Sequence, residues 1–236
     1  MSKSRKEKAV CIIPFYNEEK TLENTIRVAV ESEEFSAVVL VDDGSKDESC
    51  KVAESYSNNV ILIRNKTNAG KGQSMINGYK AVRSTLDFDR VMFLDSDLVG
   101  FEEWHIGEML YEMDQGYGMV LGHYDWKSNR EYVDSVGMYL FCTLWFPIVK
   151  QFTGERCLRK EIMDRCIEEY SDLFQNYGAE IVMNEVCKKM KLSMKYVELD
   201  GFYALSKQKK IGFWEGTEKN LKMFAEIIKK RVKLIK

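Results

Sequence analysis

The chain has 236 residues, of which 45% are hydrophobic, which is enough to bury the core of one domain. Its formal net charge of −2 argues against a general nucleic-acid-binding protein, because such domains are usually basic. The charge is unevenly spread: basic clusters lie at residues 2–6 and 229–233, while the middle of the chain is acidic.

The six cysteines are scattered, without a Cys-x-x-Cys pair, so we expect reduced thiols in a reducing compartment. With only two histidines, a zinc site is not expected. The basic start leads into a strand-like run and not into the apolar core of a signal peptide. The most apolar stretch, 136–152, is interrupted by Pro147 and Lys150 and is too short for a comfortable membrane span. We expect a soluble, cytoplasmic protein.

Apolar runs and amphipathic segments alternate through the first hundred residues. In chain order they predict a strand at 9–13, a helix at 19–32, a strand at 37–41, a helix at 47–56, a strand at 60–63, a loop at 65–72, a helix at 73–86 and a strand at 91–94. Uniformly apolar strands that alternate with such helices are typical of a parallel sheet covered on both faces. We therefore predict an α/β fold.

The second part of the chain is less regular. It predicts a helix at 101–114, a strand at 119–122, an aromatic helix at 130–152, a turn at 154–156 that leads into short helices, a helix at 175–190, a strand at 194–199 and a basic amphipathic helix at 213–235. No linker, low-complexity tract or repeat separates these elements, so we expect a single domain over residues 1–236.

Acidic residues follow three of the predicted strands. Glu18 follows the first, the 42–43 pair follows the second, and Asp95-Ser96-Asp97 comes directly after the fourth. Because ligands of parallel sheets bind beyond the carboxyl ends of the strands, we expect these side chains to share one site. A carboxylate pair in such a place is suited to hold a hard divalent cation that also contacts phosphate oxygens.

Two loops at this edge allow more than one interpretation. The 42–45 turn either caps the next helix or contacts a base or ribose, with Gly44 allowing a close approach. The 68–72 segment is either a plain loop or one that brings backbone amides and Lys71 toward phosphates, although it lacks the spacing of a Walker loop. A Gly-x-Gly-x-x-Gly fingerprint is absent after every predicted strand, which argues against a nicotinamide dehydrogenase.

Together these segments resemble the family 2 glycosyltransferases of the GT-A fold, including dolichol-phosphate mannose synthase-like enzymes and their bacterial and archaeal relatives. The segments that carry the resemblance are Pro14-Phe15-Tyr16-Asn17-Glu18, Val41-Asp42-Asp43-Gly44-Ser45-Lys46-Asp47, Asn68-Ala69-Gly70-Lys71-Gly72 and Asp95-Ser96-Asp97, with weaker matches at Thr153-Gly154-Glu155-Arg156 and Tyr177-Gly178-Ala179-Glu180. The resemblance implies a Rossmann-like, mostly parallel sheet flanked by helices. Residues 1–100 would form its nucleotide-sugar-binding half, and residues 101–236 a helical acceptor half with the basic C-terminal helix.

The resemblance also implies roles for residues on the donor side. Pro14, Tyr16 and Glu18 would shape the pocket for the nucleobase and ribose. Asp43 would accept a hydrogen bond from the base, and Lys71 would lie near the nucleotide.

The Asp-x-Asp pair would be the metal centre and part of the catalytic machinery. Asp95 would face the ribose or the metal, and Asp97 would hold Mg²⁺ or Mn²⁺ against the diphosphate. Such an ion neutralises charge that develops on the leaving nucleoside diphosphate. We expect loss of this centre to slow transfer roughly a hundredfold or more.

Each candidate on the acceptor side has two interpretations. Glu180 is either a catalytic base or acceptor-hydroxyl ligand, or a surface glutamate on an amphipathic helix. Arg156 either holds an acceptor phosphate through its planar guanidinium or forms a structural ion pair. Whether transfer inverts or retains the anomeric configuration stays open, because inversion needs a base such as Glu180.

The sequence departs from the family pattern in two places. Relatives usually carry Gly-Ser-Arg after the fifth strand, where this chain has Gly122-His123-Tyr124. Many relatives place a histidine, a possible metal ligand, after the last strand, where the 201–204 segment ends in Ala204. A different acceptor, a metal site completed by water or a reduced activity would each fit, and His123 is the nearest alternative imidazole.

The sequence therefore predicts a metal-dependent transferase that moves a sugar from a UDP- or GDP-sugar to an unidentified acceptor: a polyprenyl phosphate, a glycan or a small molecule. A non-catalytic nucleotide-sugar-binding protein and a nucleotidyltransferase are the alternatives. The aromatic residues of 138–148 and the basic C-terminal helix would suit peripheral contact with an anionic membrane. We favour a core helix and a solvated face instead.

Overall fold

The computed structural model describes residues 7–123, 151, 153–174 and 178–204. The predicted basic helix at 213–235 lies outside these ranges, as does nearly all of the predicted aromatic helix at 130–152. Within the described ranges, no helix combines the length and hydropathy needed to cross a bilayer. The cysteines in these ranges are free thiols, as predicted: Cys11, Cys50, Cys157, Cys166 and Cys187.

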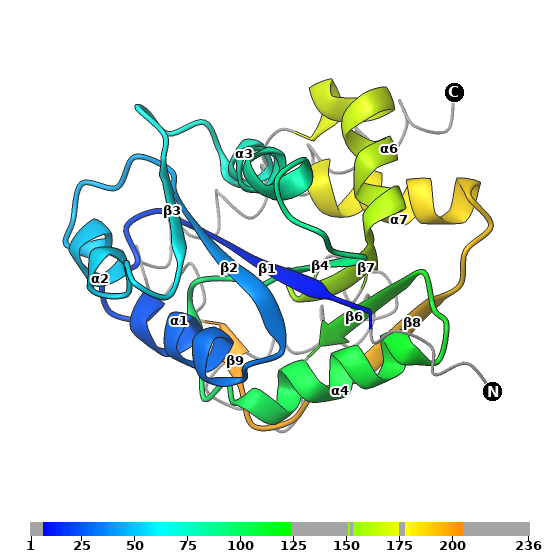
Figure 1. The fold of residues 1–236 in the computed structure, drawn as a ribbon, viewed down its shortest axis with the longest axis horizontal. Coiled ribbons are helices and arrows are strands. Elements are labelled where there is room, and N and C mark those ends of the chain that lie inside the picture. The colour runs from blue at the N-terminus through cyan, green and yellow to red at the C-terminus, as the bar shows by residue number, and fades with distance from the viewer. Residues whose placement is uncertain (1–6, 124–150, 152, 175–177, 205–236) are drawn as a thin grey trace, which may run out of the picture.

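A mostly parallel sheet forms the centre of the molecule (Figure 1). In the described part of the chain it has seven strands in the spatial order β3-β2-β1-β4-β7-β6-β8, and of these β7 alone runs antiparallel to its neighbours. The strands are β1 (Ala9–Phe15), β2 (Phe35–Asp42), β3 (Ile61–Arg64), β4 (Arg90–Phe93), β6 (Met119–His123), β7 (Arg156–Arg159) and β8 (Met194–Glu198). The predicted α/β class is confirmed.

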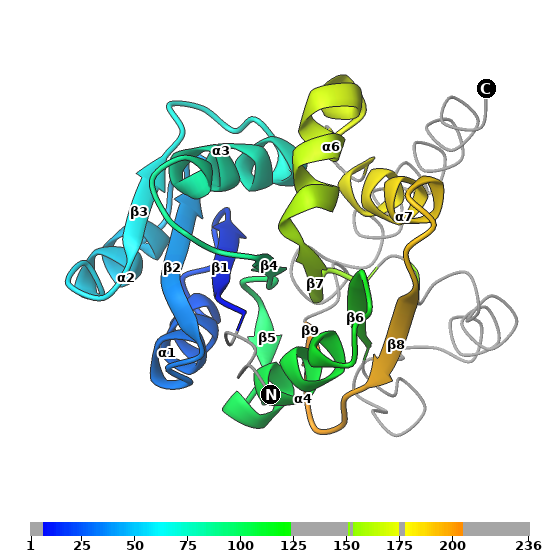
Figure 2. The ribbon, with the colours of Figure 1, turned by 45° about the vertical axis from the view of Figure 1, so that its right-hand side comes forward.

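Helices cover both faces of the sheet, as Figures 1 and 2 show from two sides. One face carries α1 (Leu22–Glu31), α2 (Ser49–Ser55) and α4 (Glu103–Asp114); the other carries α3 (Lys71–Arg83), α6 (Lys160–Tyr170) and α7 (Ala179–Lys189), and a short 3₁₀ turn (Ser171–Leu173) follows α6. Successive strand residues point to opposite faces, so Val10 and Ile12 pack in the α3 layer while Cys11 and Ile13 pack in the α1 layer. This is why β1 is apolar throughout.

The structure differs from the predicted elements mainly after residue 150. The prediction that 154–156 only begin a turn is wrong for Arg156, which starts strand β7. Arginines at both ends of this four-residue strand hide its apolar pattern. A second, two-stranded sheet pairs β5 (Leu98–Val99) with β9 (Tyr203–Ala204), and strands of two residues leave no periodic signal.

Helix α3 packs unusually close to the sheet at Gly78. A Cβ atom on this residue would lie 2.7 Å from Ile12 Cγ2 and 2.8 Å from Val41 Cγ2, which are atoms of stiff β-branched side chains. The close approach fixes the position of α3, and hence of its first residue, Lys71.

We predict that Gly78→Ala lowers the free energy of unfolding by about 1–2 kcal/mol, because overpacking outweighs the gain in helix propensity of up to about 1 kcal/mol. Gly107→Ala is the matched control: Gly107 lies inside α4 with nothing near its missing Cβ. It should raise the free energy of unfolding by about 0.5–1 kcal/mol. Urea unfolding measures both variants, and equal stabilisation by the two would contradict the close packing at Gly78.

Candidate active site

The ends of β1, β2 and β4 lie at one edge of the sheet because the three strands are parallel, with Phe15 paired to Asp42. Strand β7 runs the other way and therefore begins at this edge, where Arg156 pairs with Phe93. Residues that follow β4 consequently meet residues that precede β7. The fold thus brings the predicted Asp-x-Asp pair next to the 153–156 segment.

Asp43 holds the loop that leads into α3. Its Oδ1 accepts hydrogen bonds from Asn65 Nδ2 (2.8 Å) and the backbone N–H of Ala69 (2.9 Å), and its Oδ2 accepts one from the N–H of Gly70 (2.8 Å). The carboxylate is buried, so these bonds also compensate its lost hydration. Lys71 follows directly, and its backbone position therefore depends on Asp43. A contact between Asp43 and a nucleobase stays a prediction.

The 42–45 turn packs on the same loop. Asp42 Oδ1 accepts a hydrogen bond from the Ser45 N–H (2.8 Å), as the turn interpretation predicts. Gly44 has φ +79°, and a Cβ atom there would lie 3.1 Å from the backbone carbon of Thr67. The close approach that Gly44 allows in this structure is therefore to the protein's own loop.

Lys71 connects the donor-side and acceptor-side residues. Its Nζ lies 2.6 Å from Asp95 Oδ1 and 3.2 Å from Glu180 Oε1. Glu180 lies in the first turn of α7. Burial acts to lower the pKa of the ammonium, but the Asp95 and Glu180 carboxylates outweigh burial and hold that pKa above its ordinary value. Lys71 is therefore a persistent positive charge between two carboxylates that the sequence predicts in the same site.

Glu180 is buried, with 7% of its side chain exposed, so the interpretation as a surface glutamate is wrong. Lys71 holds its Oε1, while its Oε2 is buried without a hydrogen-bond partner among the described residues. A buried carboxylate oxygen in this state favours a ligand that donates a hydrogen bond.

Asp95 packs directly against Gly154. A Cβ atom at residue 154 would lie 2.2 Å from Asp95 Oδ2 and 2.3 Å from Oδ1, so only glycine leaves room for the carboxylate in this orientation. The observed orientation of the first residue of the Asp-x-Asp pair therefore requires a glycine in the segment before β7.

Glu155 is a buried site residue without a predicted role. Thr153 Oγ1 lies 2.6 Å from both Glu155 Oε2 and the carbonyl oxygen of Gly122. The hydroxyl has one proton, so if it donates to the carbonyl, the Glu155 contact requires a protonated carboxyl. Burial, and then the nearby Asp95 charge, raise the pKa of Glu155 to about 7. The one sequence signal for Glu155 is its place in the 153–156 segment.

Arg156 is completely buried, and its hydrogen bonds are internal to the protein. Its guanidinium donates to the carbonyl oxygens of Thr153 and Glu180 and to Asn184 Oδ1, and so ties β7 to the start of α7. Burial lowers the pKa of Arg156, although the nearby Glu180 charge acts against it. A contact with an acceptor phosphate stays a prediction for this residue.

The predicted nucleoside residues lie at and beyond the end of β1. Pro14 is buried within the strand, and Tyr16, just beyond it, is 38% exposed. The Glu18 N–H donates to Ser49 Oγ (2.7 Å), and Glu18 Oε2 accepts a hydrogen bond from Thr21 Oγ1 (3.2 Å). Tyr16 is the member of this group that presents a large surface to an incoming ligand.

Asp97 lies in the link between β4 and β5 and is partly exposed. Leu98, the next residue, pairs with Ala204 of β9, so the segment without the family histidine runs directly beside the Asp-x-Asp pair.

The donor set fits a shared divalent ion. In the described ranges, no three His, Cys, Asp or Glu side chains converge closely enough to hold a metal. Mg²⁺ is commonly bound by one or two carboxylates together with substrate phosphates and water. Asp95 and Asp97 would supply two such carboxylates, and a diphosphate and water would supply the remaining ligands.

Comparison with known proteins gives the family. The sequence model described as "Glycosyl transferase family 2" matches residues 10–168, more than half of the chain. The chain belongs to glycosyl transferase family 2. The family resemblance seen in the sequence is confirmed.

Curated relatives match over shorter segments. The family 2 chain is 37% identical over 93 residues to an uncharacterized protein of Methanocaldococcus jannaschii, covering 37% of this chain and 39% of that protein. It is 31% identical over 128 residues to the undecaprenyl-phosphate 4-deoxy-4-formamido-L-arabinose transferase of Photorhabdus laumondii, covering 51% of this chain and 38% of that protein. The matches thus span about two fifths of the relatives' own lengths.

Solved structures confirm the fold. Glucosyl-3-phosphoglycerate synthase from Mycobacterium tuberculosis, crystallised with Mn²⁺, UDP and glucosyl-3-phosphoglycerate, superposes with a TM-score of 0.72 and 17% identity. The match covers 97% of this chain and 80% of that one. The expected GT-A architecture of this family 2 glycosyltransferase is therefore present.

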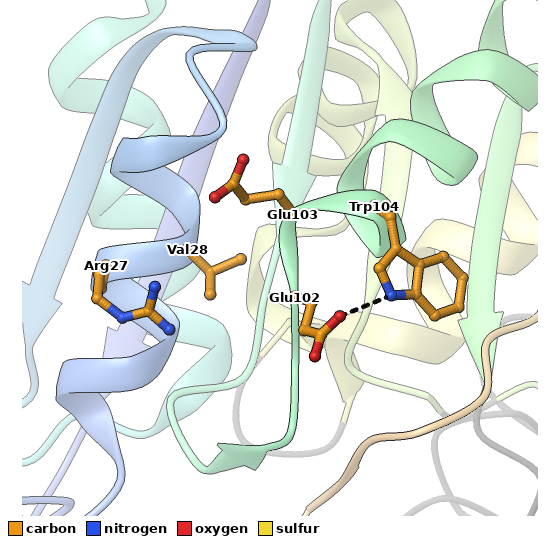
Figure 3. A pocket seen from close by; sticks show the side chains of 5 residues that line it. All are labelled: Arg27, Val28, Glu102, Glu103 and Trp104. Atoms are coloured by element: carbon orange, nitrogen blue, oxygen red, sulfur yellow. Dashed lines mark hydrogen bonds between the residues drawn. The ribbon is translucent and has the colours of Figure 1, made fainter.

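A surface hollow of about 360 Å³ lies away from the predicted site residues. It is formed by α1 and the start of α4 (Figure 3), and Trp104 donates a hydrogen bond to Glu102 at its rim. Its lining residues are Arg27, Val28, Glu102, Glu103 and Trp104. None of the residues predicted for the glycosyltransferase site lines it.

We predict that Glu155 makes the metal-free protein less stable as pH rises. The unfolded carboxyl loses its proton near pH 4.5 and the folded one only near pH 7, so the free energy of unfolding falls across this window. Glu155→Gln removes this effect and should exceed wild type in stability by about 2–3 kcal/mol at pH 8, with little difference at pH 4.5.

Urea unfolding in the presence of EDTA measures this difference at each pH. Glu161→Gln is the control, because Glu161 lies exposed in the first turn of α6 and its difference from wild type should stay constant. A Glu155→Gln difference that does not change between the two pH values would contradict the prediction.

Proposed function

We propose that this protein transfers a sugar from a UDP- or GDP-sugar, with Mg²⁺ or Mn²⁺ bound, to an acceptor that carries a hydroxyl group. The observation that carries the proposal is the contact of Lys71 with both Asp95 and Glu180, because it joins a carboxylate of the donor side to one of the acceptor side. Membership of glycosyl transferase family 2 supports the nucleotide-sugar donor.

On the donor side, Tyr16 would form a wall of the nucleoside pocket, together with Pro14 and Glu18. Asp43 would reach the base with the accepting capacity left after its bonds to the loop. The diphosphate would lie at the start of α3, where backbone N–H groups and the helix dipole favour an anion and Lys71 adds a full charge. The exposure of Tyr16 at the sheet edge supports this arrangement.

Asp95 and Asp97 would hold the divalent ion. Once bound between these carboxylates and the diphosphate, the ion would neutralise the charge that develops on the leaving nucleotide. Gly154 permits the orientation of Asp95 that this role needs, because any larger residue would clash with the carboxylate. The presence of Mn²⁺ or Mg²⁺ with UDP in structures of the same fold supports a divalent cofactor.

Glu180 would orient the acceptor hydroxyl and take its proton. Its buried Oε2, without a partner in the described ranges, is suited to accept a hydrogen bond from that hydroxyl. Arg156 would keep Glu180 in place through the Glu180 carbonyl.

A polyprenyl phosphate is the second candidate acceptor. The name of the Photorhabdus relative supports it, since that protein acts on undecaprenyl phosphate. A phosphate oxygen is already ionised at neutral pH and needs no base. With such an acceptor the reaction would therefore depend little on Glu180.

We predict that Asp97→Asn abolishes the thermal stabilisation given by UDP or GDP together with Mn²⁺ and slows sugar transfer about a hundredfold or more. Glu180→Gln should leave nucleotide binding intact and slow transfer to a hydroxyl acceptor by about 10²–10⁴. Thermal shift measures binding, and release of the nucleoside diphosphate measures turnover.

The control is Asp172→Asn, an exposed carboxylate on the turn after α6. It should behave as wild type in both assays. The proposal fails if neither nucleotide stabilises the wild type, or if Asp97→Asn responds just as strongly. Binding without turnover on any donor would instead identify a nucleotide-sugar-binding protein.

A further inference from the structure

We propose that the Lys71 ammonium pairs with Asp95 in place of the divalent ion until the diphosphate of a nucleotide-sugar donor binds the ammonium instead. Tight binding of the divalent ion, and the loss of the Lys71–Glu180 ion pair, would then both require the donor. This inference rests on the proposed function, because it assigns the Asp-x-Asp pair to a metal and Glu180 to the acceptor.

The first support is the geometry around the ammonium. Lys71 Nζ lies 2.6 Å from Asp95 Oδ1 and 3.2 Å from Glu180 Oε1, so one positive charge neutralises both carboxylates. About 30% of the Lys71 side chain is exposed, so the side chain is open to a ligand that enters from solvent.

The second support is that packing and loop hydrogen bonds hold the backbone at Lys71, while its ammonium is held by ion pairs that a charged ligand can replace. Asp43 holds the preceding loop, and Gly78 seats α3 against the sheet. Gly154 leaves room for the carboxylate of Asp95 in the position where it meets Lys71. The four-carbon stem of Lys71 is thus the part that can move without disturbing the fold.

Electrostatics makes the ammonium and a metal ion competitors. A divalent ion bound to Asp95 would lie within a few ångströms of Lys71 Nζ, and the repulsion of like charges at such a distance exceeds thermal energy several-fold. A diphosphate changes this balance, because its oxygens offer the ammonium a charge-assisted hydrogen bond. The metal ion and the nucleotide therefore favour each other's binding through Lys71.

The same movement would act on Glu180. When Lys71 turns to the diphosphate, Glu180 Oε1 loses its ion pair, and both oxygens of the carboxylate become available to an acceptor. In the donor-free protein, one of them is held. Lys71 is in this sense a positioning residue that makes Glu180 competent only in the donor complex.

The test measures Mn²⁺ binding without nucleotide, by electron paramagnetic resonance of free Mn²⁺ in the folded protein. Lys71→Met should bind Mn²⁺ alone about tenfold or more tightly than wild type, because the competing charge is gone. Lys71→Arg keeps the charge and should stay as weak as wild type. Lys51→Met, which removes an exposed lysine on α2, should also match wild type.

The double variant Lys71→Met/Asp97→Asn should lose the increase in Mn²⁺ affinity. This result would show that the additional Mn²⁺ binding takes place at the Asp-x-Asp pair. Unchanged or weaker Mn²⁺ binding by Lys71→Met, or a gain that survives Asp97→Asn, would overturn the inference. The proposed function is tested separately by UDP with Mn²⁺ on the wild type. If the wild type binds UDP together with Mn²⁺ but Lys71→Met binds Mn²⁺ alone no more tightly than wild type, the role of Lys71 is wrong and the proposed function is unaffected.

Discussion

The buried carboxylate of Asp43 is bonded to the amides of the loop before α3, and the position of Lys71 depends on those bonds. Bonds to a charged group contribute more than neutral ones, at about 1.5–3 kcal/mol each. They connect the end of β2 to the start of α3, while Gly78 seats the same helix on β1 and β2. These contacts hold the backbone at the start of α3, and with it the position from which the Lys71 ammonium reaches Asp95.

Charge balance is the second constraint on this edge of the sheet. Among the described residues, the carboxyls of Asp95, Glu155 and Glu180 lie around the cations of Lys71 and Arg156. Burial penalises unpaired charge, and a neutral Glu155 leaves two negative groups against two positive ones. The raised pKa of Glu155 follows from this arrangement. Ion pairs hold this cluster together, so a change in one of its charges would alter the pKa values of the neighbouring groups.

The meeting of Asp43 and Asp95 at one edge of the sheet could be predicted from sequence because its signals are local. Asp43 and Asp95 each follow an apolar run that becomes a parallel strand, and parallel strands end at a common edge. The surroundings of Glu180 and Gly154 could not be predicted in the same way. Strand β7 is recognisable only through its pairing with β4, more than sixty positions away in the sequence, as in the Phe93–Arg156 pair. The burial of Glu180 and the close contact of Gly154 with Asp95 both follow from that pairing.

The antiparallel course of β7 ties the end of β6 to the surroundings of Asp95. Strand β6 ends at His123, and the chain returns beside it, where the Gly122 N–H donates to the Glu155 carbonyl (2.9 Å) and Thr153 bonds the Gly122 carbonyl. Two hydrogen bonds thus fasten the end of β6 to the Thr153–Glu155 segment. Gly154, within this segment, packs against the carboxylate of Asp95. A substitution that shifts Gly122 would therefore also shift the surroundings of Asp95.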